Sequence, residues 1–223
     1  MEPEATRRGQ PRAHARAAAV RDSGPTASAG RSAATRLLQA ARKPLPNLPV
    51  VRSVSRCHYT QAMTQVRLGL AHADDAATIA AMSRQLIEHG LAWSWNEERV
   101  ARCLRNRDCV VLAARDRRRV IGFAIMEFYA IHAHLNLFAV QPGYQRQGIG
   151  RQLLEWLEAS ARTAGIFKVY LEVRATNGGA LAFYEKLGYR WVGRKPAYYD
   201  GREDAVRMVH DLAVTSTSPA EPQ

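Results

Sequence analysis

Residues 135–161 read LNLFAVQPGYQRQGIGRQLLEWLEASA, and this stretch decides the fold of the chain. Residues 135–140 form an apolar run of strand composition, which Gln141-Pro142-Gly143 ends. The apolar residues that follow recur at the spacing of one buried helix face: Ile149, Leu153, Leu154, Trp156, Leu157 and Ala161. The stretch therefore predicts a strand, a tight loop and a long helix that Gly165 ends.

The loop at 145–150 has the chemistry of a phosphate site. The first N–H groups of a helix have no partner within the helix, and the helix dipole adds partial positive charge there. Gly148 and Gly150 lack a Cβ atom, which lets a ligand approach the backbone closely. Arg146 and Arg151 add formal charge, so the loop suits a pyrophosphate. Two glycines alone would fit an ordinary strand-to-helix turn better, and neither GxxxxGK[ST] nor GxGxxG is present.

The pattern Gln145-x-x-Gly148-x-Gly150, placed after Ala139-Val140, resembles the cofactor loop of the GNAT N-acetyltransferases. The resemblance spans residues 64–212 and is closest to bacterial N-α-acetyltransferases that modify the N-terminal alanine of a small-subunit ribosomal protein. Three further segments match that subgroup in order: LEVRATN at 171–177, AFYEKLGY at 182–189, and Tyr198-Tyr199 followed by Glu203-Asp204-Ala205.

The fold class expected from the resemblance is α/β, the GNAT fold, with a mixed central sheet flanked by helices and with strands four and five splayed apart. Hydrophobic periodicity separately indicates an α/β sandwich around one mixed sheet. Besides the long helix, helices are expected from Asp74 to about His89, from a capping box that starts at Ser94 to about 104, and at 178–187. Strands are expected at 64–70, 109–114, 120–128, 132–140, 166–173, 189–193 and 205–212.

The resemblance implies that acetyl-CoA is the acetyl donor and that no metal is needed. The main chain of residues 138–140 would pair with the pantetheine arm, and the amide of Val140 would stabilise the oxyanion. The cofactor contacts implied in this way are Phe138, Ala139, Val140, Gln145, Arg146, Gln147, Gly148, Ile149, Gly150, Arg151, Asn177 and Tyr184.

Glu172 is the first candidate for the general base. It lies in an otherwise apolar strand, where burial would raise its pKa towards the working pH. A carboxylate paired with Arg174 or Arg207 explains the same position, and the resemblance favours the base. His132 and His134 lie two residues apart on one strand face and are rival bases, although solvent-facing histidines fit both positions.

Tyr184 is the candidate general acid, because a phenol can protonate a departing thiolate; a core tyrosine is the alternative. The resemblance implies that the corresponding tyrosine reaches the sulfur. Cys57, Cys103 and Cys109 fall outside the motifs, which favours direct attack by the amine over an acetyl-cysteine route.

Trp95, Tyr198 and Tyr199 are the candidate acceptor-binding residues. Trp93 and Trp95 precede the second expected helix, and core packing is the better interpretation for one of them. Tyr198 and Tyr199 are expected in a loop between the last two strands. The resemblance implies that this loop holds the backbone of an acceptor peptide; two tyrosines at a hairpin rim are the alternative.

The net charge of +12 gathers in the first 62 residues, which hold 11 Lys and Arg against 3 Asp and Glu. Residues 1–62 are therefore expected to be a disordered basic extension, a spurious one or a targeting peptide, ahead of a catalytic domain at 63–214 and a disordered tail at 215–223. The cysteine pattern and the lack of a long apolar run indicate a cytoplasmic protein that does not bind membranes.

The function expected from these features is acetyl-CoA-dependent N-acetylation, with the N-terminal amine of a peptide or protein, such as a ribosomal protein, as acceptor. A polyamine, an amino acid or an aminoglycoside is the alternative acceptor. An alternative that is not an enzyme is a nucleic-acid-binding protein with a degenerate acetyltransferase fold. The intact motif residues argue against such degeneracy: Gly148, Gly150, Glu172 and Tyr184.

Overall fold

A computed structural model describes residues 51–53 and 64–213 of the chain. The described strands form one mixed sheet in the order β1-β2-β3-β4-β5-β6-β8-β7. Neighbouring strands of this sheet run antiparallel, apart from the parallel pair β5 and β6. The strand bounds are β1 Val51–Ser53, β2 Thr64–Leu70, β3 Cys109–Asp116, β4 Arg119–Phe128, β5 Ala133–Val140, β6 Lys168–Arg174, β7 Arg190–Tyr199 and β8 Glu203–Asp211.

The edge strand β1 corrects the expected domain boundary. Residues 51–53 belong to the stretch that the sequence assigned to the extension, yet they pair with β2 through Val51 opposite Val66. The domain therefore includes a strand that precedes residue 63. The expectations for residues 1–50, 54–63 and 214–223 lie outside the described residues.

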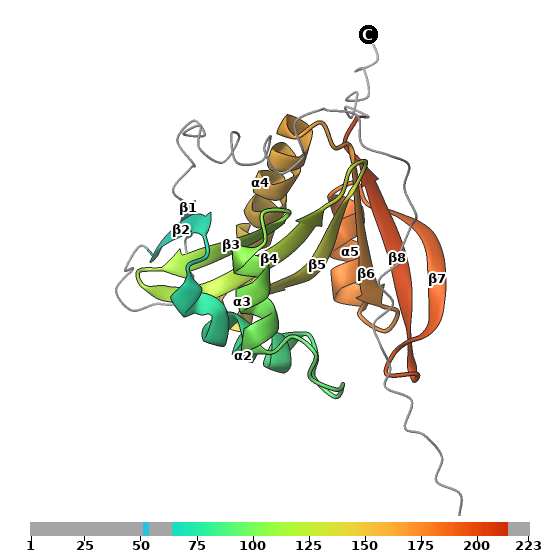
Figure 1. Cartoon of the computed structure of the whole chain (residues 1–223), viewed down its shortest axis with the longest axis horizontal. Helices are drawn as coiled ribbons and strands as arrows, with labels where there is room; N and C mark the ends of the chain where they lie inside the picture. Colours follow the sequence, from blue (N-terminus) through green and yellow to red (C-terminus); the bar gives the residue numbers. More distant parts are fainter. Residues whose placement is uncertain (1–50, 54–63, 214–223) are drawn as a thin grey trace, which may run out of the picture.

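Helices cover both faces of the sheet (Figure 1). The helices α2 (Ala76–Leu86) and α3 (Glu97–Arg105) lie on one face, whereas α4 (Ile149–Thr163) and α5 (Gly178–Lys186) lie on the other. Two short 3-10 turns, η1 (Ala73–Asp75) and η2 (Pro142–Tyr144), precede α2 and α4.

The expected helix starts were wrong by a few residues. Asp74 does not cap α2, because η1 comes first and the neighbouring Asp75 pairs with Arg115 at 2.5 Å. The cap of α3 is Asn96, whose Oδ1 accepts the N–H of Arg99, in place of the expected Ser94. The predicted cap of α5 is confirmed, since Asn177 Oδ1 accepts the N–H of Ala180 at 3.0 Å.

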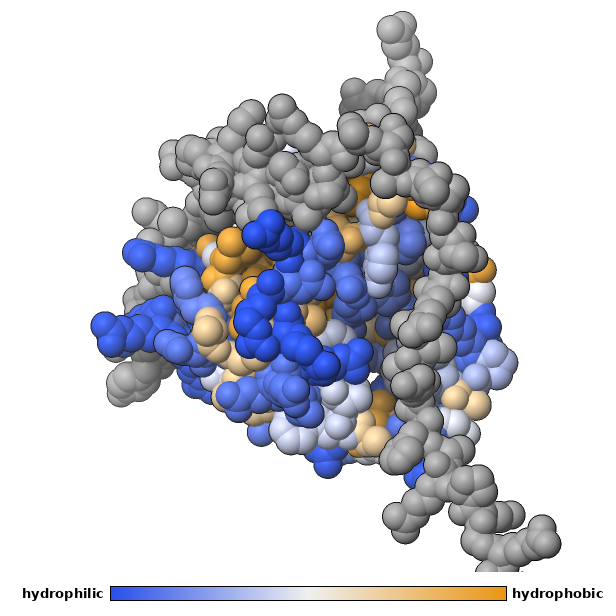
Figure 2. Space-filling model, viewed as in Figure 1, coloured by the Kyte–Doolittle hydropathy of each residue, from blue (hydrophilic) through white to orange (hydrophobic). Residues whose placement is uncertain are grey.

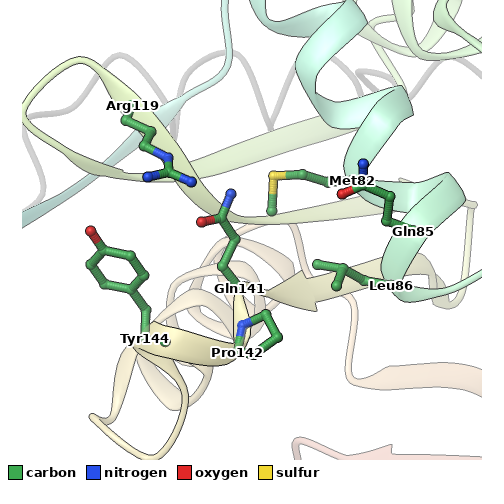
Figure 3. Close-up of a pocket in the computed structure, with 8 residues that line it drawn as sticks. Met82, Gln85, Leu86, Arg119, Gln141, Pro142 and Tyr144 are labelled. Carbon is green, nitrogen blue, oxygen red and sulfur yellow. The ribbon is translucent and has the colours of Figure 1, made fainter.

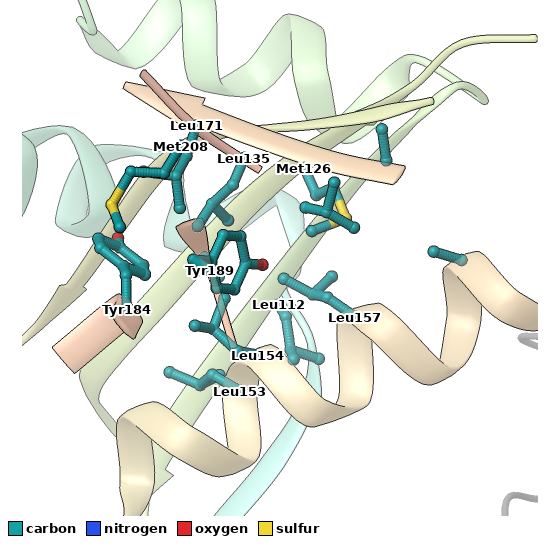
Figure 4. Packing of buried hydrophobic residues seen from close by; sticks show 14 of the residues in the cluster. Leu112, Met126, Leu135, Leu153, Leu154, Leu157, Leu171, Tyr184, Tyr189 and Met208 are labelled. Atoms are coloured by element: carbon teal, nitrogen blue, oxygen red, sulfur yellow. The ribbon is translucent and has the colours of Figure 1, made fainter. Parts of the chain in front are cut away.

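The predicted long helix is confirmed and supplies the larger of two cores. Leu153, Leu154 and Leu157 of α4 are at most 1% exposed and pack against the sheet (Figure 4). Burial of each such side chain stabilises the fold by about 1.5–3 kcal/mol. A second core, which contains Ile79 of α2 and Phe123 of β4, lies on the opposite face.

A bulge in β5 positions the candidate site. Ile125 of β4 pairs with Leu137, and Met126 pairs with Leu135, so Asn136 is the extra residue. Because one extra residue turns the following side chains to the other face, Leu135 packs on the α4 side whereas Leu137 packs on the α2 side. The parallel pairing with β6 also ends here, at Leu135 opposite Leu171. Beyond this point β5 and β6 splay apart, as the resemblance implied.

The last hairpin differs from the expected loop. β7 continues to Tyr199, which pairs with Glu203 of β8, and only residues 200–202 form the turn. Tyr198 and Tyr199 therefore end a strand, where the sequence analysis placed them in a loop. Their strand position fixes their backbone relative to Glu172 on β6, because β8 lies between the two strands.

No helix within the described ranges combines the length and the apolar composition that a membrane span requires.

Candidate functional site

The loop before α4 exposes backbone N–H groups at a helix start. Gly148 is the N-cap of α4 with φ +80°, a left-handed conformation that suits glycine, and no side chain caps this helix. Arg146 is also left-handed, with φ +60°, and is exposed. Two glutamine side chains brace the loop: Gln145 Nε2 donates to Val140 O at 2.9 Å, and Gln147 Nε2 donates to Gly143 O at 3.1 Å. The loop is thus held open to an anion at the positive end of α4.

The absence of a side chain at Gly150 is needed for packing. A Cβ atom at this position would lie 3.0 Å from Phe138 Cζ and 3.2 Å from Phe183 Cζ. These two rings stack with their centroids 5.6 Å apart and join β5 to α5. The expectation that both glycines admit a ligand to the backbone therefore applies to Gly148, around which a Cβ would find space.

The free edge of β5 beyond the bulge offers backbone groups to a ligand. Gln141 N donates to Ile121 O at 2.8 Å, so Gln141 and Ile121 form a hydrogen-bonded pair of the antiparallel ladder. Hydrogen-bonded and non-hydrogen-bonded pairs alternate along such a ladder. Phe138 and Val140 are therefore in non-hydrogen-bonded pairs and direct their N–H and C=O groups towards the splay. Ala139 directs its own towards β4, so its expected main-chain contact with the cofactor is not supported.

Glu172 lies on β6 where the splay begins, and its side chain is only 6% exposed. Three cationic or imidazole groups surround the carboxylate: His134 Nε2 at 2.6 Å, Lys195 Nζ at 2.7 Å and Arg207 Nε at 3.6 Å. Burial by itself would raise the pKa of Glu172, but the hydrogen bonds and charges of His134 and Lys195 lower it to about 2. The expected rise of this pKa is therefore wrong, and Glu172 is ionised at neutral pH.

The arginine pairing that the sequence offered as an alternative is half confirmed. Arg207 lies beside Glu172, whereas Arg174 pairs with Glu203 at 3.1 Å and donates to Ile87 O and His89 O. Lys195 was not foreseen, because nothing in the sequence around a lysine on β7 indicates that its ammonium group reaches β6.

Comparisons with known proteins fit this geometry. A model of the acetyltransferase (GNAT) family matches residues 79–189. The [ribosomal protein bS18]-alanine N-acetyltransferase of Escherichia coli K12 is 44% identical over 99 residues, which cover 43% of this chain and 67% of that protein. The chain belongs to the GNAT acetyltransferase family.

One further relative and one solved structure support this assignment. The N-alpha-acetyltransferase RimI of Mycobacterium tuberculosis is 45% identical over 71 residues, which cover 32% of this chain and 40% of that protein. The crystal structure of the Escherichia coli ribosomal-protein-S18-alanine N-acetyltransferase aligns with a TM-score of 0.57 and 31% identity, over 70% of this chain and 100% of that one.

As a GNAT enzyme, this chain is an N-acetyltransferase whose acetyl donor is acetyl-CoA. The residues at the splay fit that donor. The uncapped start of α4 suits the pyrophosphate, and the outward backbone groups of Phe138 and Val140 suit an arm with amide groups. Arg151 extends outward at the same end of α4, where it pairs loosely with Glu155 at 3.9 Å.

Tyr184 of α5 lies beneath the splay and is 7% exposed. Its ring contacts Phe183 and Tyr189, with centroids 5.4 and 5.5 Å away. Burial, followed by the charge of Tyr199, raises the pKa of Tyr184 above its ordinary value. The phenol is therefore protonated throughout the neutral range, as a proton donor must be. It is also part of the core, which confirms the alternative interpretation, while its role as general acid stays a prediction.

The expected acceptor side consists of the α2–α3 connection and the end of β7. The Tyr199 hydroxyl donates to Glu172 O at 3.4 Å, and its ring meets that of Tyr198 edge-on at 5.0 Å. Trp95 is 8% exposed and belongs to the second core, whereas Trp93 is 47% exposed. One tryptophan is thus core, as predicted. It is Trp95, however, so the direct acceptor contact expected of Trp95 is not supported.

Cations border the acceptor side. The guanidinium of Arg99 lies 3.9 Å from the ring centroid of Trp95, and the ammonium of Lys195 lies 4.9 Å from that of Tyr198. The exposed side of the molecule around α3 is hydrophilic (Figure 2). The rim of the site is therefore positively charged beside the buried carboxylate of Glu172.

A separate groove of about 420 Å³ lies between α2 and the turn that follows β5 (Figure 3). It is lined by Met82, Gln85, Leu86, Arg119, Gln141, Pro142, Gly143 and Tyr144. None of these residues belongs to the group around Glu172, so the groove lies next to the loop before α4 and apart from that group.

Proposed function

We propose that this enzyme transfers the acetyl group of acetyl-CoA to the N-terminal α-amine of a peptide or protein. The observation that carries the proposal is the position of Tyr198 and Tyr199 at the end of β7, next to the buried carboxylate of Glu172. Two phenols can hydrogen-bond an extended backbone without selecting side chains. The similarity to enzymes named for the N-terminal alanine of a ribosomal protein supports the same acceptor class.

A ribosomal protein N-terminus is the first specific acceptor to test. The relatives whose names specify the alanine of bS18 are similar to this chain over 97 to 99 residues. An α-amine also has a pKa near 8, below that of about 10.4 for lysine, so it needs less help to lose its proton at neutral pH.

In the proposed mechanism, the chain contributes one group to each task. The backbone N–H groups at the start of α4 and the braced loop hold the donor, and the outward amide of Val140 donates to the thioester oxygen as negative charge develops. Glu172 receives the proton of the acceptor amine, and Tyr184 returns a proton to the leaving sulfur. Asn177, Arg146 and Arg151 complete the proposed cofactor contacts. The amine attacks directly in a ternary complex.

Mass spectrometry on a panel of acceptors tests the acceptor class. The panel contains a peptide with a free N-terminal alanine, the same peptide with a blocked N-terminus and a free lysine, and spermidine with an aminoglycoside. We expect acetylation of the first peptide alone. Faster acetylation of spermidine or of the aminoglycoside would show that the acceptor is a small amine and not a peptide.

The proposed catalytic unit comprises residues 51–213, because β1 pairs with β2. We expect a chain that starts at residue 50 to keep its melting temperature and turnover. A chain that starts at residue 63 exposes the edge of β2 and melts earlier. Loss of activity in the longer variant would show that residues 1–49 contribute to catalysis.

A further inference from the structure

His134 is held between two acceptor groups at the point where the splay begins. Its Nε2 atom lies 2.6 Å from Glu172 Oε2, and its Nδ1 atom lies 2.8 Å from Asn136 Oδ1. His134 belongs to the parallel pairing of β5 with β6, opposite Tyr170, one residue before that pairing ends. The imidazole therefore adjoins both the proposed base and the gap for the thioester.

The orientation of the Asn136 amide follows from its other partner. Its Nδ2 atom lies 3.4 Å from Glu127 Oε2, and an ionised carboxylate can only accept hydrogen bonds. The amide oxygen must then face His134. Because an amide oxygen cannot donate, the proton of that bond resides on His134 Nδ1. The bulge turns Asn136 to this side of the sheet and makes the contact possible.

This tautomer has a consequence for the contact with Glu172. With Nδ1 protonated, neutral His134 presents a lone pair at Nε2, and the carboxylate presents a lone pair at Oε2. Two lone pairs do not approach to 2.6 Å unless a proton lies between them. The resting pair therefore holds one shared proton, while Lys195 and Arg207 face the other oxygen of Glu172.

We propose that His134 and Glu172 act as one proton-accepting dyad for the acceptor amine, with Asn136 as a positioning residue. The inference rests on the role proposed above for Glu172. The dyad first releases its shared proton to water. It then takes one proton from the acceptor ammonium, and this proton comes to lie between Oε2 and Nε2. The freed nitrogen lone pair forms the N–C bond to the acetyl carbonyl, and the C–S bond breaks with its electron pair leaving on sulfur. Tyr184 gives its hydroxyl proton to that sulfur, and the new amide nitrogen returns its second proton through water to the Tyr184 phenolate.

The dyad makes the reaction rate depend on pH. At low pH the shared proton stays in place and the dyad cannot accept another, so kcat/KM rises as pH increases through the macroscopic pKa of the pair. The groups that face the dyad are Glu127 from β4, His132 just before β5, Asn136 from β5, Tyr170 from β6, Lys195, Tyr198 and Tyr199 from β7, and Arg207 from β8. The cations favour loss of the shared proton, and Glu127 opposes it.

His210 provides a matched control. It lies on β8, and its Nδ1 atom lies 2.9 Å from Glu158 Oε1, so it also pairs with a buried carboxylate but away from the splay. The experiment measures kcat/KM between about pH 5.5 and 9.5 for wild type, His134→Gln and His210→Gln. We expect His134→Gln to lower kcat at least tenfold, with its acidic inflection moved or lost and its Kd for coenzyme A unchanged. His210→Gln should keep the wild-type profile.

Asn136→Asp gives a second test, in which the direction of the pH shift is predicted. A carboxylate beside Nδ1 favours the protonated dyad, so the acidic inflection should move to higher pH in this variant. The ¹⁵N signals of the His134 ring, followed across the same pH range, should show a protonated Nδ1 throughout.

The possible outcomes separate the dyad from the proposed function. Wild-type rate and inflection in folded His134→Gln, or a ring protonated at Nε2 alone, would overturn the dyad. If Glu172→Gln is nevertheless inactive, the role of Glu172 survives. Full activity in Glu172→Gln would exclude both the dyad and the proposed role of Glu172 as base.

Discussion

The side chain of Asp200 accepts a hydrogen bond from the backbone N–H of Ala92 at 2.5 Å, across a sequence separation of 108 residues. Ala92 lies in the connection between α2 and α3, and Asp200 lies in the turn between β7 and β8, with φ +51°. This bond joins the two segments that border Glu172 on the acceptor side. The strained turn residue is thus tied to the opposite wall of the site.

Asp200→Ala should loosen the acceptor side alone. Loss of this bond lets the two segments separate, so we expect KM for the acceptor peptide to rise about 5–50-fold while kcat and the Kd for coenzyme A change little. Steady-state kinetics and calorimetry measure these quantities. Asp211→Ala, an acidic residue at the far end of β8, is the control. An equal change in both variants would contradict the bridging role.

Arg146→Glu should weaken coenzyme A binding. Arg146 is exposed at the loop before α4, so charge reversal there repels a pyrophosphate without disturbing the core. We expect Kd to rise roughly 10–100-fold by calorimetry. Arg162→Glu makes the same charge change at the other end of α4 and should bind normally. Gly150→Glu is a poor test, because its side chain would collide with Phe138 and Phe183.

Tyr184→Phe should slow the chemical step more than it weakens binding. The substitution keeps the ring contacts with Phe183 and Tyr189 and removes only the hydroxyl. Single-turnover rates should fall about 10²–10⁴-fold, with a Kd for coenzyme A within a few-fold of wild type. Tyr189→Phe removes the hydroxyl that donates to Glu158, away from the splay, and serves as control. Unchanged single-turnover rates in Tyr184→Phe would exclude the acid role.

Glu172 should contribute stability that acid removes. Its folded pKa of about 2 lies below its ordinary value of 4.5, so the carboxylate stabilises the fold above pH 4.5 and loses this contribution as pH falls towards 2. The contribution is on the order of 3 kcal/mol. Urea unfolding at pH 7, 5, 4 and 3 should therefore show Glu172→Gln less stable than wild type at pH 7, with a gap that narrows in acid.

The control for this stability measurement is Glu155→Gln. Its carboxylate is 56% exposed and its ion pair with Arg151 spans 3.9 Å, so solvent screens the interaction. We expect little difference from wild type at any pH. A gap for Glu172→Gln that stays constant from pH 7 to pH 3 would mean that the ion pairs of Glu172 do not stabilise the fold.

The enzyme should select acceptor peptides by the charge of the residue that follows the N-terminal alanine. Arg99, Lys195 and Arg207 lie around Tyr198, and the nearby carboxylate of Glu172 is already paired. We expect a peptide that begins Ala-Asp to have a several-fold higher kcat/KM than one that begins Ala-Lys, with a difference that shrinks at high salt. Arg99→Glu should reverse the preference. Equal rates at low salt would show that the rim does not select charge.

The sequence by itself determined the organisation around residues 135–161. Hydrophobic periodicity specified α4 and most strands, because both signals are local and each element buries one face. The same stretch predicted the anion site, since helix N-termini and a left-handed glycine act within a few residues of each other. The resemblance to the GNAT family added the splay between β5 and β6.

Only the tertiary structure decided how the side chains of the site meet. Glu172, His134 and Lys195 come from three strands, and their approach depends on the register and on the bulge at Asn136, which no local pattern specifies. The same approach reversed the expected pKa shift of Glu172, because the charges of neighbouring strands outweigh burial. Likewise, the sequence indicated that Gly150 lets a ligand approach the backbone, whereas the structure shows that two aromatic rings, from β5 and α5, pack against it.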